Sequence, residues 1–165
     1  MRFTAVLLCL VAFSMVPGCG FQLRGTADVP FETVYLPNPT GGVQLDLSRQ
    51  IQAGTRAKVV DDATKAQAIM QFTEETRQKE ILSLSSAGRV REFRLRYRVG
   101  WRVHDGKGAD YVPQNTIVLF RDVSFNDSDI LAKETEEQLL FRDMQADMVS
   151  QIMRRLAAAQ TPKPQ

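Results

Sequence analysis

Four arginines at nearly alternate positions are the residues whose type and spacing point most clearly to chemistry: Arg94, Arg96, Arg98 and Arg102. A guanidinium carries a permanent positive charge and a fork of N–H donors that matches the oxygens of a phosphate or carboxylate. In a β-strand, side chains two positions apart share a face and stand about 6.6–6.8 Å from one another. The spacing therefore predicts a row of groups that binds anionic headgroups or an acidic protein surface.

A second interpretation of the same arginines is structural. Acidic side chains on neighbouring strands could neutralise them, and the candidates are Glu74, Glu75 and Asp122. The arginine row would then be a solvated sheet face that binds no ligand. The sequence leaves both interpretations open.

Residues that support catalysis or metal binding do not form a recognisable site. His104 is the sole histidine, and it stands beside Asp105 where a strand ends, as expected of a turn residue. The paired carboxylates Asp61 and Asp62 lie at an element boundary, where acidic side chains commonly cap the backbone. The sequence contains no Gly-x-Ser-x-Gly, no His-Glu-x-x-His and no phosphate-binding glycine loop. We therefore predict a protein that is not an enzyme and that carries no metal or cofactor.

The first residues have the order of a bacterial export signal. Arg2 is followed by an uncharged, mostly apolar run over residues 3–15, too short for a helix that crosses a bilayer, and then by Gly18 and Cys19. A small residue directly before a cysteine resembles the lipobox of bacterial lipoproteins. That resemblance implies removal of residues 1–18, attachment of lipid to Cys19 and, because Gly20 rather than Asp follows, transfer to the outer membrane.

Removal of the signal would leave 147 residues, the size of one ordinary domain. We assign residues 19–160 to that domain and residues 161–165, with two prolines, to a disordered tail. Cys9 would leave with the signal, so no pair of thiols remains for a disulfide. The net charge of the mature chain would be +1, yet positions 89–107 hold seven basic residues against two acidic ones.

The arginines belong to a predicted strand in which apolar and basic side chains alternate strictly. Apolar side chains at positions 93, 95, 97, 99, 101 and 103 point one way, and the arginines point the other. The other predicted strands lie at 34–36, 58–60, 68 towards 81, and 116–125. Helices are predicted from 43 to 54 and from about 133. Turns are predicted at Gly88 and at 105–108. The last helix has a core face of Leu140, Met144, Met148, Ile152 and Leu156.

These elements predict an α+β fold. We expect a two-layer sandwich in which a roughly four-stranded mixed sheet is covered on one face by two helices, because neither layer can leave its apolar face in water. The arginine face of the long strand would then be the exposed working surface.

Three segments together resemble the LptE family of lipopolysaccharide-assembly lipoproteins. They are the Cys-Gly-Phe-Gln-Leu-Arg-Gly run at 19–25, the strand pair around Glu92–Phe93 and Leu119–Arg121, and residues 131–138 leading into a helix that ends at 152–156. The resemblance implies a two-layer fold, residence as a plug inside the outer-membrane β-barrel LptD, and binding of lipopolysaccharide on its way to the outer leaflet. It also implies a location at the periplasmic side of the outer membrane and in the barrel lumen.

Two other functions are consistent with some of these features. A structural lipoprotein could bridge envelope components without binding lipid, and charge reversal at Arg96 and Arg98 would separate it from a lipopolysaccharide-binding protein. A nucleic-acid platform would combine a basic groove with stacking aromatic residues. Here the aromatic residues lie on the face opposite the arginines, and export removes the chain from nucleic acid, so we expect no nucleic-acid partner.

Overall fold

The computed structural model describes residues 28–37, 39–125 and 130–161. The predicted signal segment at 1–18, Cys19, the run at 19–25 and the tail beyond Thr161 lie outside the described residues. The described elements are β1 (Thr33–Tyr35), α2 (Gly42–Gly54), β2 (Lys58–Val60), a 3₁₀ turn η1 (Ala63–Lys65), β3 (Ala68–Leu84), β4 (Val90–His104), β5 (Asp110–Ser124) and α3 (Ile130–Ala157).

The strands form one mixed sheet in the order β2-β1-β3-β4-β5. The short strands β1 and β2 are parallel, and β1 continues parallel to the start of β3, whereas β3, β4 and β5 are antiparallel. The sheet therefore has five strands rather than about four. The short strand predicted at 58–60 is present as β2 and pairs with β1 over Lys58–Val60, which brings the total to five.

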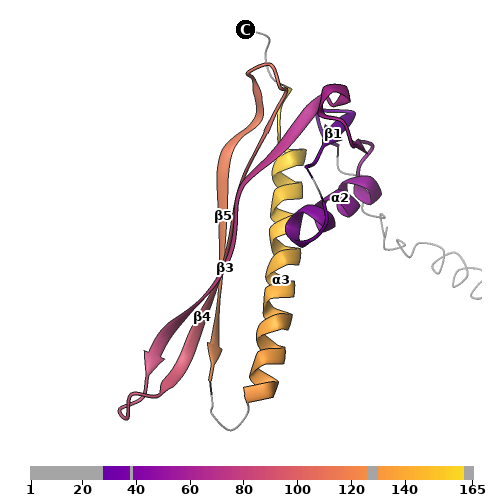
Figure 1. Cartoon of the computed structure of the whole chain (residues 1–165). Coiled ribbons are helices and arrows are strands. Elements are labelled where there is room, and N and C mark those ends of the chain that lie inside the picture. Colours follow the sequence, from indigo (N-terminus) through magenta and orange to yellow (C-terminus); the bar gives the residue numbers. More distant parts are fainter. Residues whose placement is uncertain (1–27, 38, 126–129, 162–165) are drawn as a thin grey trace, which may run out of the picture.

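Both helices cover the same face of the sheet (Figure 1), which confirms the predicted two-layer α+β fold. The alternation of β4 decides which of its side chains face this layer. Leu95, Tyr97, Val99, Trp101 and Val103 are buried against the helices. Each large apolar side chain that is fully removed from water contributes about 1.5–3 kcal/mol, so the register of β4 is strongly specified.

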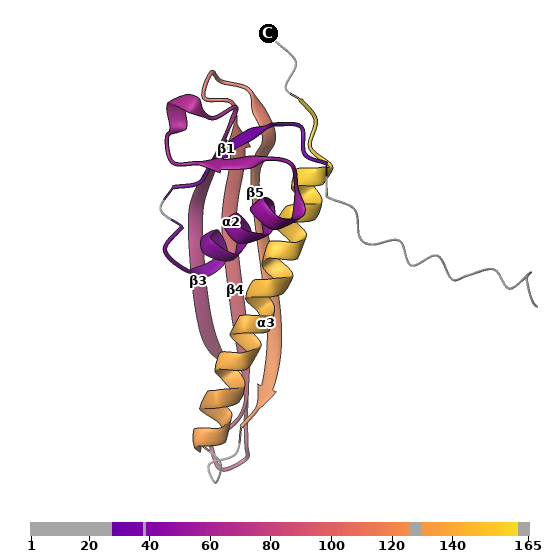
Figure 2. The same ribbon diagram turned by 90° about the vertical axis from the view of Figure 1, so that its right-hand side faces the viewer.

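Helix α3 supplies most of the second layer. Four residues of the predicted core face, Met144, Met148, Ile152 and Leu156, are buried. The fifth, Leu140, is only partly buried against the core. At about 1.5 Å per residue the 28 residues of α3 span about 42 Å. The shorter α2 packs Val43, Leu47 and Ile51 beside the C-terminal half of α3, while the N-terminal half of α3 continues past α2 along the sheet (Figure 2).

Two tight turns connect the three long strands β3, β4 and β5 at opposite ends of the sheet. Gly88, with φ of 73°, lies in the turn between β3 and β4, as predicted. At the other end, Asp105 accepts hydrogen bonds from the backbone N–H groups of Lys107 (2.7 Å) and Ala109 (3.0 Å) in the turn between β4 and β5. We call the end that holds the β3–β4 turn and the start of α3 the distal end; β1, α2 and the β4–β5 turn lie at the opposite end (Figures 1 and 2).

A polar cluster fixes α2 and α3 to the sheet. The Tyr97 hydroxyl donates to the Glu75 carboxylate (2.6 Å) and accepts from Arg77 (3.1 Å). Arg77 also donates to Gln145 of α3 (2.5 Å), whose amide N–H donates in turn to Asp46 of α2 (2.5 Å). Burial, followed by the hydrogen bond to Glu75, raises the pKa of Tyr97. The cluster thus gives the buried hydroxyl of Tyr97 both a hydrogen-bond acceptor and a hydrogen-bond donor.

Candidate functional site

The four predicted arginines all lie on the face of β4 that the helices leave open, opposite the buried aromatic and aliphatic side chains. Gly100 interrupts the row between Arg98 and Arg102. A Cβ at Gly100 would stand 2.6 Å from the Thr73 hydroxyl, which lies at the bulge of β3 between Phe72 and Glu74. The row therefore consists of Arg94, Arg96 and Arg98, and then of Arg102, which Gly100 separates from the other three.

Each arginine has an acceptor on a neighbouring strand. Arg94 binds both carboxylate oxygens of Asp122 on β5, at 2.8 and 2.9 Å. The remaining pairs involve β3: Arg96 with Glu80 at 3.0 Å, Arg98 with Glu74 at 2.9 Å, and Arg102 with the Gln71 side-chain oxygen at 2.7 Å. The open face thus carries three ion pairs, of Arg94, Arg96 and Arg98, followed by the hydrogen bond from Arg102 to Gln71, and we call these four arginines and their partners the ion-pair ladder.

Two of the three carboxylates expected from the sequence, Glu74 and Asp122, do pair with the arginines. The third, Glu75, points to the helix side and binds Tyr97 instead. Adjacent residues of a strand point to opposite faces, and the bulge at Thr73 shifts the alternation of β3 by one residue, so that Glu74 rather than Glu75 faces the arginines. The hydrogen bonds between Arg94 and Asp122 raise the pKa of Arg94 and lower the pKa of Asp122.

Phe120 adds an aromatic element to the ion-pair ladder. Its ring is 45% exposed, and the guanidinium carbons of Arg94 and Arg96 lie 5.7 and 5.4 Å from its centroid. Guanidinium groups are attracted to the faces of aromatic rings at such distances. The open face therefore combines neutralised charge with a flat aromatic surface, a composition that suits contact with a polar protein wall.

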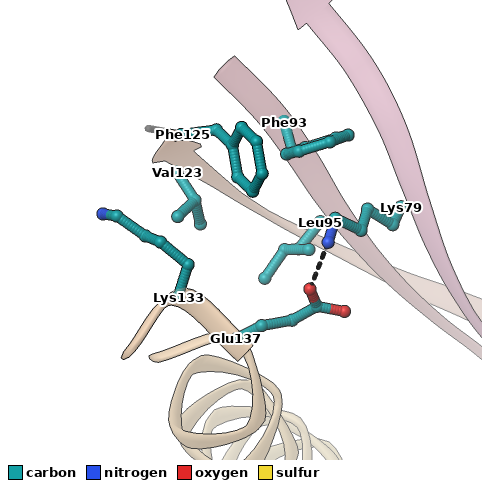
Figure 3. A pocket seen from close by; sticks show the side chains of 7 residues that line it. All are labelled: Lys79, Phe93, Leu95, Val123, Phe125, Lys133 and Glu137. Carbon is teal, nitrogen blue, oxygen red and sulfur yellow. Dashed lines mark hydrogen bonds and ion pairs between the residues drawn. The ribbon is translucent and has the colours of Figure 1, made fainter. Parts of the chain in front are cut away.

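A second group of candidate residues lies on the helix side at the distal end. A small hollow is surrounded by Lys79, Phe93, Leu95 and Val123 of the sheet, by Phe125 directly after β5, and by Lys133 and Glu137 of α3 (Figure 3). The rings of Phe93 and Phe125 meet edge to face at 5.2 Å. The hollow holds about 10 Å³, room for at most one water molecule. We call these seven residues the distal pocket.

The cations of the distal pocket are held by carboxylates. The Lys79 ammonium donates to Glu137 at 2.5 Å (Figure 3) and lies 4.3 Å from the centroid of Phe93. The Lys133 ammonium lies 2.7 Å from Glu136. Both lysines remain partly exposed, with side chains 38% and 22% accessible. Two ammonium groups therefore flank an aromatic and aliphatic floor at the mouth of the hollow.

Sequence reasoning did not find the distal pocket, because Lys79 and Lys133 are far apart in the chain. A signal was nevertheless present in α3. Lys133 and Glu137 continue the spacing of the core stripe from Leu140 towards the start of the helix. Charged residues at core-facing positions of a helix are unusual. Here they show that the core-facing side of α3 changes from apolar to charged before Leu140.

The remaining sequence candidates have structural roles. His104 accepts a hydrogen bond from the backbone N–H of Gly106 (3.1 Å), as expected of a turn residue. Asp62 caps the short turn η1 by accepting from Thr64 (2.9 Å). Within the described residues, no cluster of three histidine, cysteine or acidic side chains could hold a metal ion.

The chain matches a known protein family. Residues 31–156 match the family model LptE, described as lipopolysaccharide-assembly. That match spans the whole two-layer sandwich. The chain belongs to the LptE family. It shares 25% of residues over 155 positions with the LPS-assembly lipoprotein LptE of Photorhabdus laumondii, covering 91% of this chain and 83% of that protein. The Yersinia pestis (strain Pestoides F) protein of the same name is 30% identical over 155 residues, covering 91% of this chain and 73% of the relative.

Solved structures of related lipoproteins have the same fold. The solution structure of an uncharacterized lipoprotein B from Nitrosomonas europaea is 47% identical, with a TM-score of 0.72 over 84% of this chain and 91% of that one. A minor lipoprotein from Acinetobacter baumannii, 21% identical, has a TM-score of 0.64 over 83% of this chain and 98% of its own, and supports the fold alone. Among the described helices, none is both long and apolar enough to cross a membrane.

Proposed function

We propose that this LptE-family chain is a non-enzymatic lipoprotein that binds lipopolysaccharide, plugs the outer-membrane β-barrel LptD and helps to deliver lipopolysaccharide to the outer leaflet. The family match over residues 31–156 is the observation that carries the proposal. The match concerns lipopolysaccharide assembly, a task that requires recognition of an amphipathic anion. Two surfaces of the molecule divide that task between lipid and protein.

The distal pocket has the composition that lipid A requires. Lipid A combines phosphate groups with acyl chains, so its site needs cations beside an apolar surface. Lys79 and Lys133 provide the charge, and the edges of Phe93 and Phe125 provide the apolar floor. A hydrogen bond between an ammonium and a phosphate is stronger than one between neutral groups. We therefore assign the headgroup contact to the two lysines.

Glu137 competes with that ligand. Its carboxylate holds the Lys79 ammonium at 2.5 Å and closes the hollow to a volume too small for a sugar phosphate. A phosphate that binds here replaces Glu137 as the partner of Lys79 and lies across the mouth of the pocket. Glu137 thus acts as an internal anion that sets the affinity of the site.

The ion-pair ladder is better suited to the partner protein. Arg94, Arg96 and Arg98 already bind carboxylates within the sheet, so a lipid phosphate would have to displace Asp122, Glu80 and Glu74. A polar barrel wall can instead add hydrogen bonds to the pairs without breaking them. We therefore assign Arg94, Arg96, Arg98 and Arg102 to contact with the wall of LptD.

The anchor completes the proposal. Acyl chains on Cys19 hold the chain at the periplasmic leaflet of the outer membrane, because each buried methylene contributes about 0.8 kcal/mol and two or three chains are attached. The folded domain then extends into the barrel lumen. The proposal includes no enzymatic step and no cofactor.

Lipopolysaccharide binding by the full lipid-anchored chain in detergent tests the lipid step. The double variant Lys79→Gln/Lys133→Gln is expected to bind at least roughly tenfold more weakly, because two charge-assisted contacts are lost. Lys58→Gln, an exposed lysine at the opposite end in β2, is the matched control and should bind as the parent does. Glu137→Gln should bind more tightly, whereas Glu134→Gln, exposed on the same helix, should not. Equal affinity of all these variants would contradict the assignment.

A structural lipoprotein that bridges envelope components without lipid is the rival function. Reversing Arg96 and Arg98 to glutamate should reduce recovery of LptD and of the lipopolysaccharide it carries if the ladder contacts the partner, but it also breaks the ion pairs with Glu80 and Glu74. The exchange Arg98→Glu/Glu74→Arg separates contact from internal pairing, since it rebuilds the ion pair with reversed polarity. Recovery that stays low in the exchanged variant supports contact with the partner. Full recovery would restrict Arg98 to a role inside the sheet.

A further inference from the structure

Helix α3 is held to the sheet unevenly along its length. The core-facing side chains in residues 144–156 are buried. Before them, Leu140 and Phe141 are only partly buried against the core, and Leu139 is 50% exposed. Buried apolar surface is the main attraction between a helix and a sheet. The first half of α3 is therefore attached more weakly than the second.

The boundary between the two halves lies at Gln145. Its side chain accepts a hydrogen bond from Arg77 of β3 (2.5 Å) and donates to the Gly42 carbonyl (3.2 Å) and the Asp46 carboxylate (2.5 Å) of α2. The first half of α3 continues past α2 towards the distal end (Figure 2). In the part of the chain that the structure describes, the hydrogen bonds that join α3 to α2 thus lie at Gln145.

An ion pair connects the first half of α3 to the sheet. Glu137 accepts a hydrogen bond from the Lys79 ammonium of β3 at 2.5 Å, and the two side chains are 26% and 38% exposed. Lys133 binds Glu136 of its own helix and lies 3.5 Å from the Ser124 hydroxyl. A partly exposed ion pair stabilises a fold less than the burial of one large apolar side chain. A competing anion can therefore break the Lys79–Glu137 pair, which we call the latch.

An apolar floor lies beneath this half of the helix (Figure 3). Leu95 and Val123 are 1% and 7% exposed, and the rings of Phe93 and Phe125 adjoin them. The hollow between the floor and the helix has room for at most one water molecule. Strands β4 and β5 are paired without a register shift beside the floor. A ligand that reaches the floor must therefore displace the helix rather than the sheet.

We propose that residues 133–141 form a lid over an acyl-chain site. An anionic headgroup takes the place of Glu137 on Lys79, the lid opens, and an acyl chain of the same ligand packs on the floor. A ligand shifts such an equilibrium only by binding the open state better than the closed one. The headgroup removes the latch and the chain replaces the apolar contacts of the lid, so an amphipathic anion does both. The inference rests on the lipid binding proposed above and states how the distal pocket admits the lipid.

The lid opens by unwinding the first turns of α3. Residues 133–157 contain no glycine or proline, the residues at which helices usually kink. Local opening in proteins involves regions with few buried apolar contacts, which in α3 is the half before Met144. Unwinding at the helix end leaves the second half and the hydrogen bonds of Gln145 in place. The plug can therefore keep its position in the barrel while the lid opens.

Hydrogen–deuterium exchange of the full lipid-anchored chain in a non-ionic detergent tests the latch without lipopolysaccharide. Glu137→Gln should raise the exchange rate of the backbone amides in residues 133–141 by roughly threefold, because it weakens the pair with Lys79. Residues 144–156 should exchange as in the parent. Glu134→Gln is the matched control, because Glu134 is exposed on the same helix. Equal exchange of the lid in Glu137→Gln and in the parent would overturn the inference.

A photoreactive lipid tests the acyl-chain site. The probe is phosphatidic acid with a diazirine in one acyl chain, because it combines a phosphate with an apolar chain. Cross-links to Leu95 and Val123 are expected, although both are buried in the closed structure. The double variant Lys79→Gln/Lys133→Gln should form them roughly tenfold less often. Labelling confined to residues that are exposed in the closed structure, such as Ile81, would overturn the inference.

Lipopolysaccharide separates failure of this inference from failure of the proposed function. Added lipopolysaccharide should suppress the cross-links and should raise the exchange of residues 133–141 in the parent, because unwound turns lose their helical hydrogen bonds. Lipopolysaccharide that binds and leaves this exchange unchanged would overturn the lid alone. A parent chain that binds no lipopolysaccharide would overturn the proposed function and, with it, the inference.

Discussion

The buried hydroxyl of Tyr97 makes two hydrogen bonds to β3, to Glu75 and from Arg77, and Arg77 in turn contacts α3 through Gln145. Tyr97→Phe removes both bonds and keeps the ring. We expect the free energy of unfolding to fall by about 1–2 kcal/mol, since the lost bonds involve charged partners that water can only partly reach. Tyr111→Phe is the control, because the ring of Tyr111 packs on Phe31 at 5.5 Å and no hydrogen bond holds its hydroxyl in the described structure. Urea denaturation measures both changes.

The raised pKa of Tyr97 gives a pH dependence with a defined sign. Above pH 10 the unfolded tyrosine begins to ionise, while burial keeps the folded one protonated. The unfolded state then binds fewer protons, so the free energy of unfolding falls as the pH rises. We expect the urea midpoint of the parent to drop more steeply between pH 9 and 11 than that of Tyr97→Phe. Parallel curves for the two proteins would show that Tyr97 does not titrate differently on folding.

Single residues also show where sequence reasoning reaches its limit. The sequence predicts Glu74 and Asp122 as possible partners of the arginines without saying which arginine each one binds; the structure pairs Asp122 with Arg94 and Glu74 with Arg98. Glu80 was not foreseen as the partner of Arg96, and Glu75 was assigned to the wrong face. Both errors come from the bulge at Thr73, which alternation alone does not reveal. Whether these arginines contact a ligand or a partner stays a prediction.

Among the elements, α2 depends on a backbone conformation at its first residue. Gly42 has φ of 61°, and a Cβ there would stand 2.7 Å from the Glu75 carboxylate. We expect Gly42→Ala to destabilise the fold by about 1–3 kcal/mol, through left-handed strain and displacement of Glu75. Gly41→Ala is the matched control, because its backbone is extended and nothing lies within 4 Å of the added methyl. Thermal unfolding of both variants compares them, and equal losses would contradict this account of α2.

Both the long elements and the short strands at 34–36 and 58–60 could be predicted from the sequence, whereas the pairing of the short strands could not. The alternation in β4 and the stripe in α3 each repeat over several turns or strand residues, so their faces could be assigned from the sequence. The three-residue strand β2 lies where the sequence predicts it, but its parallel pairing with β1 is a tertiary contact that no local pattern encodes. The start of β5 was placed at 116 rather than Asp110 because Pro113 and polar neighbours obscure its first residues.

At the scale of the whole molecule, the two candidate surfaces lie at different places along the long axis. Figure 1 shows the β3–β4 turn and the start of α3 at one end and β1 at the other. The distal pocket forms at the start of α3, and the ion-pair ladder follows β4 along the open face of the sheet. The two-layer fold could be predicted because each layer must bury its apolar face. The distal pocket could not, because it forms only where three strands and the start of a helix from distant parts of the chain meet.

Affinity purification of the full chain from detergent-solubilised outer membrane tests the central claim most directly. The protein is captured under mild conditions, its partners are identified by mass spectrometry, and lipopolysaccharide is detected by blotting. We predict recovery of one large β-barrel protein, LptD, in stoichiometric amount together with lipopolysaccharide. Recovery of the lipoprotein alone, or with peptidoglycan-associated proteins and without lipopolysaccharide, would contradict the proposed function.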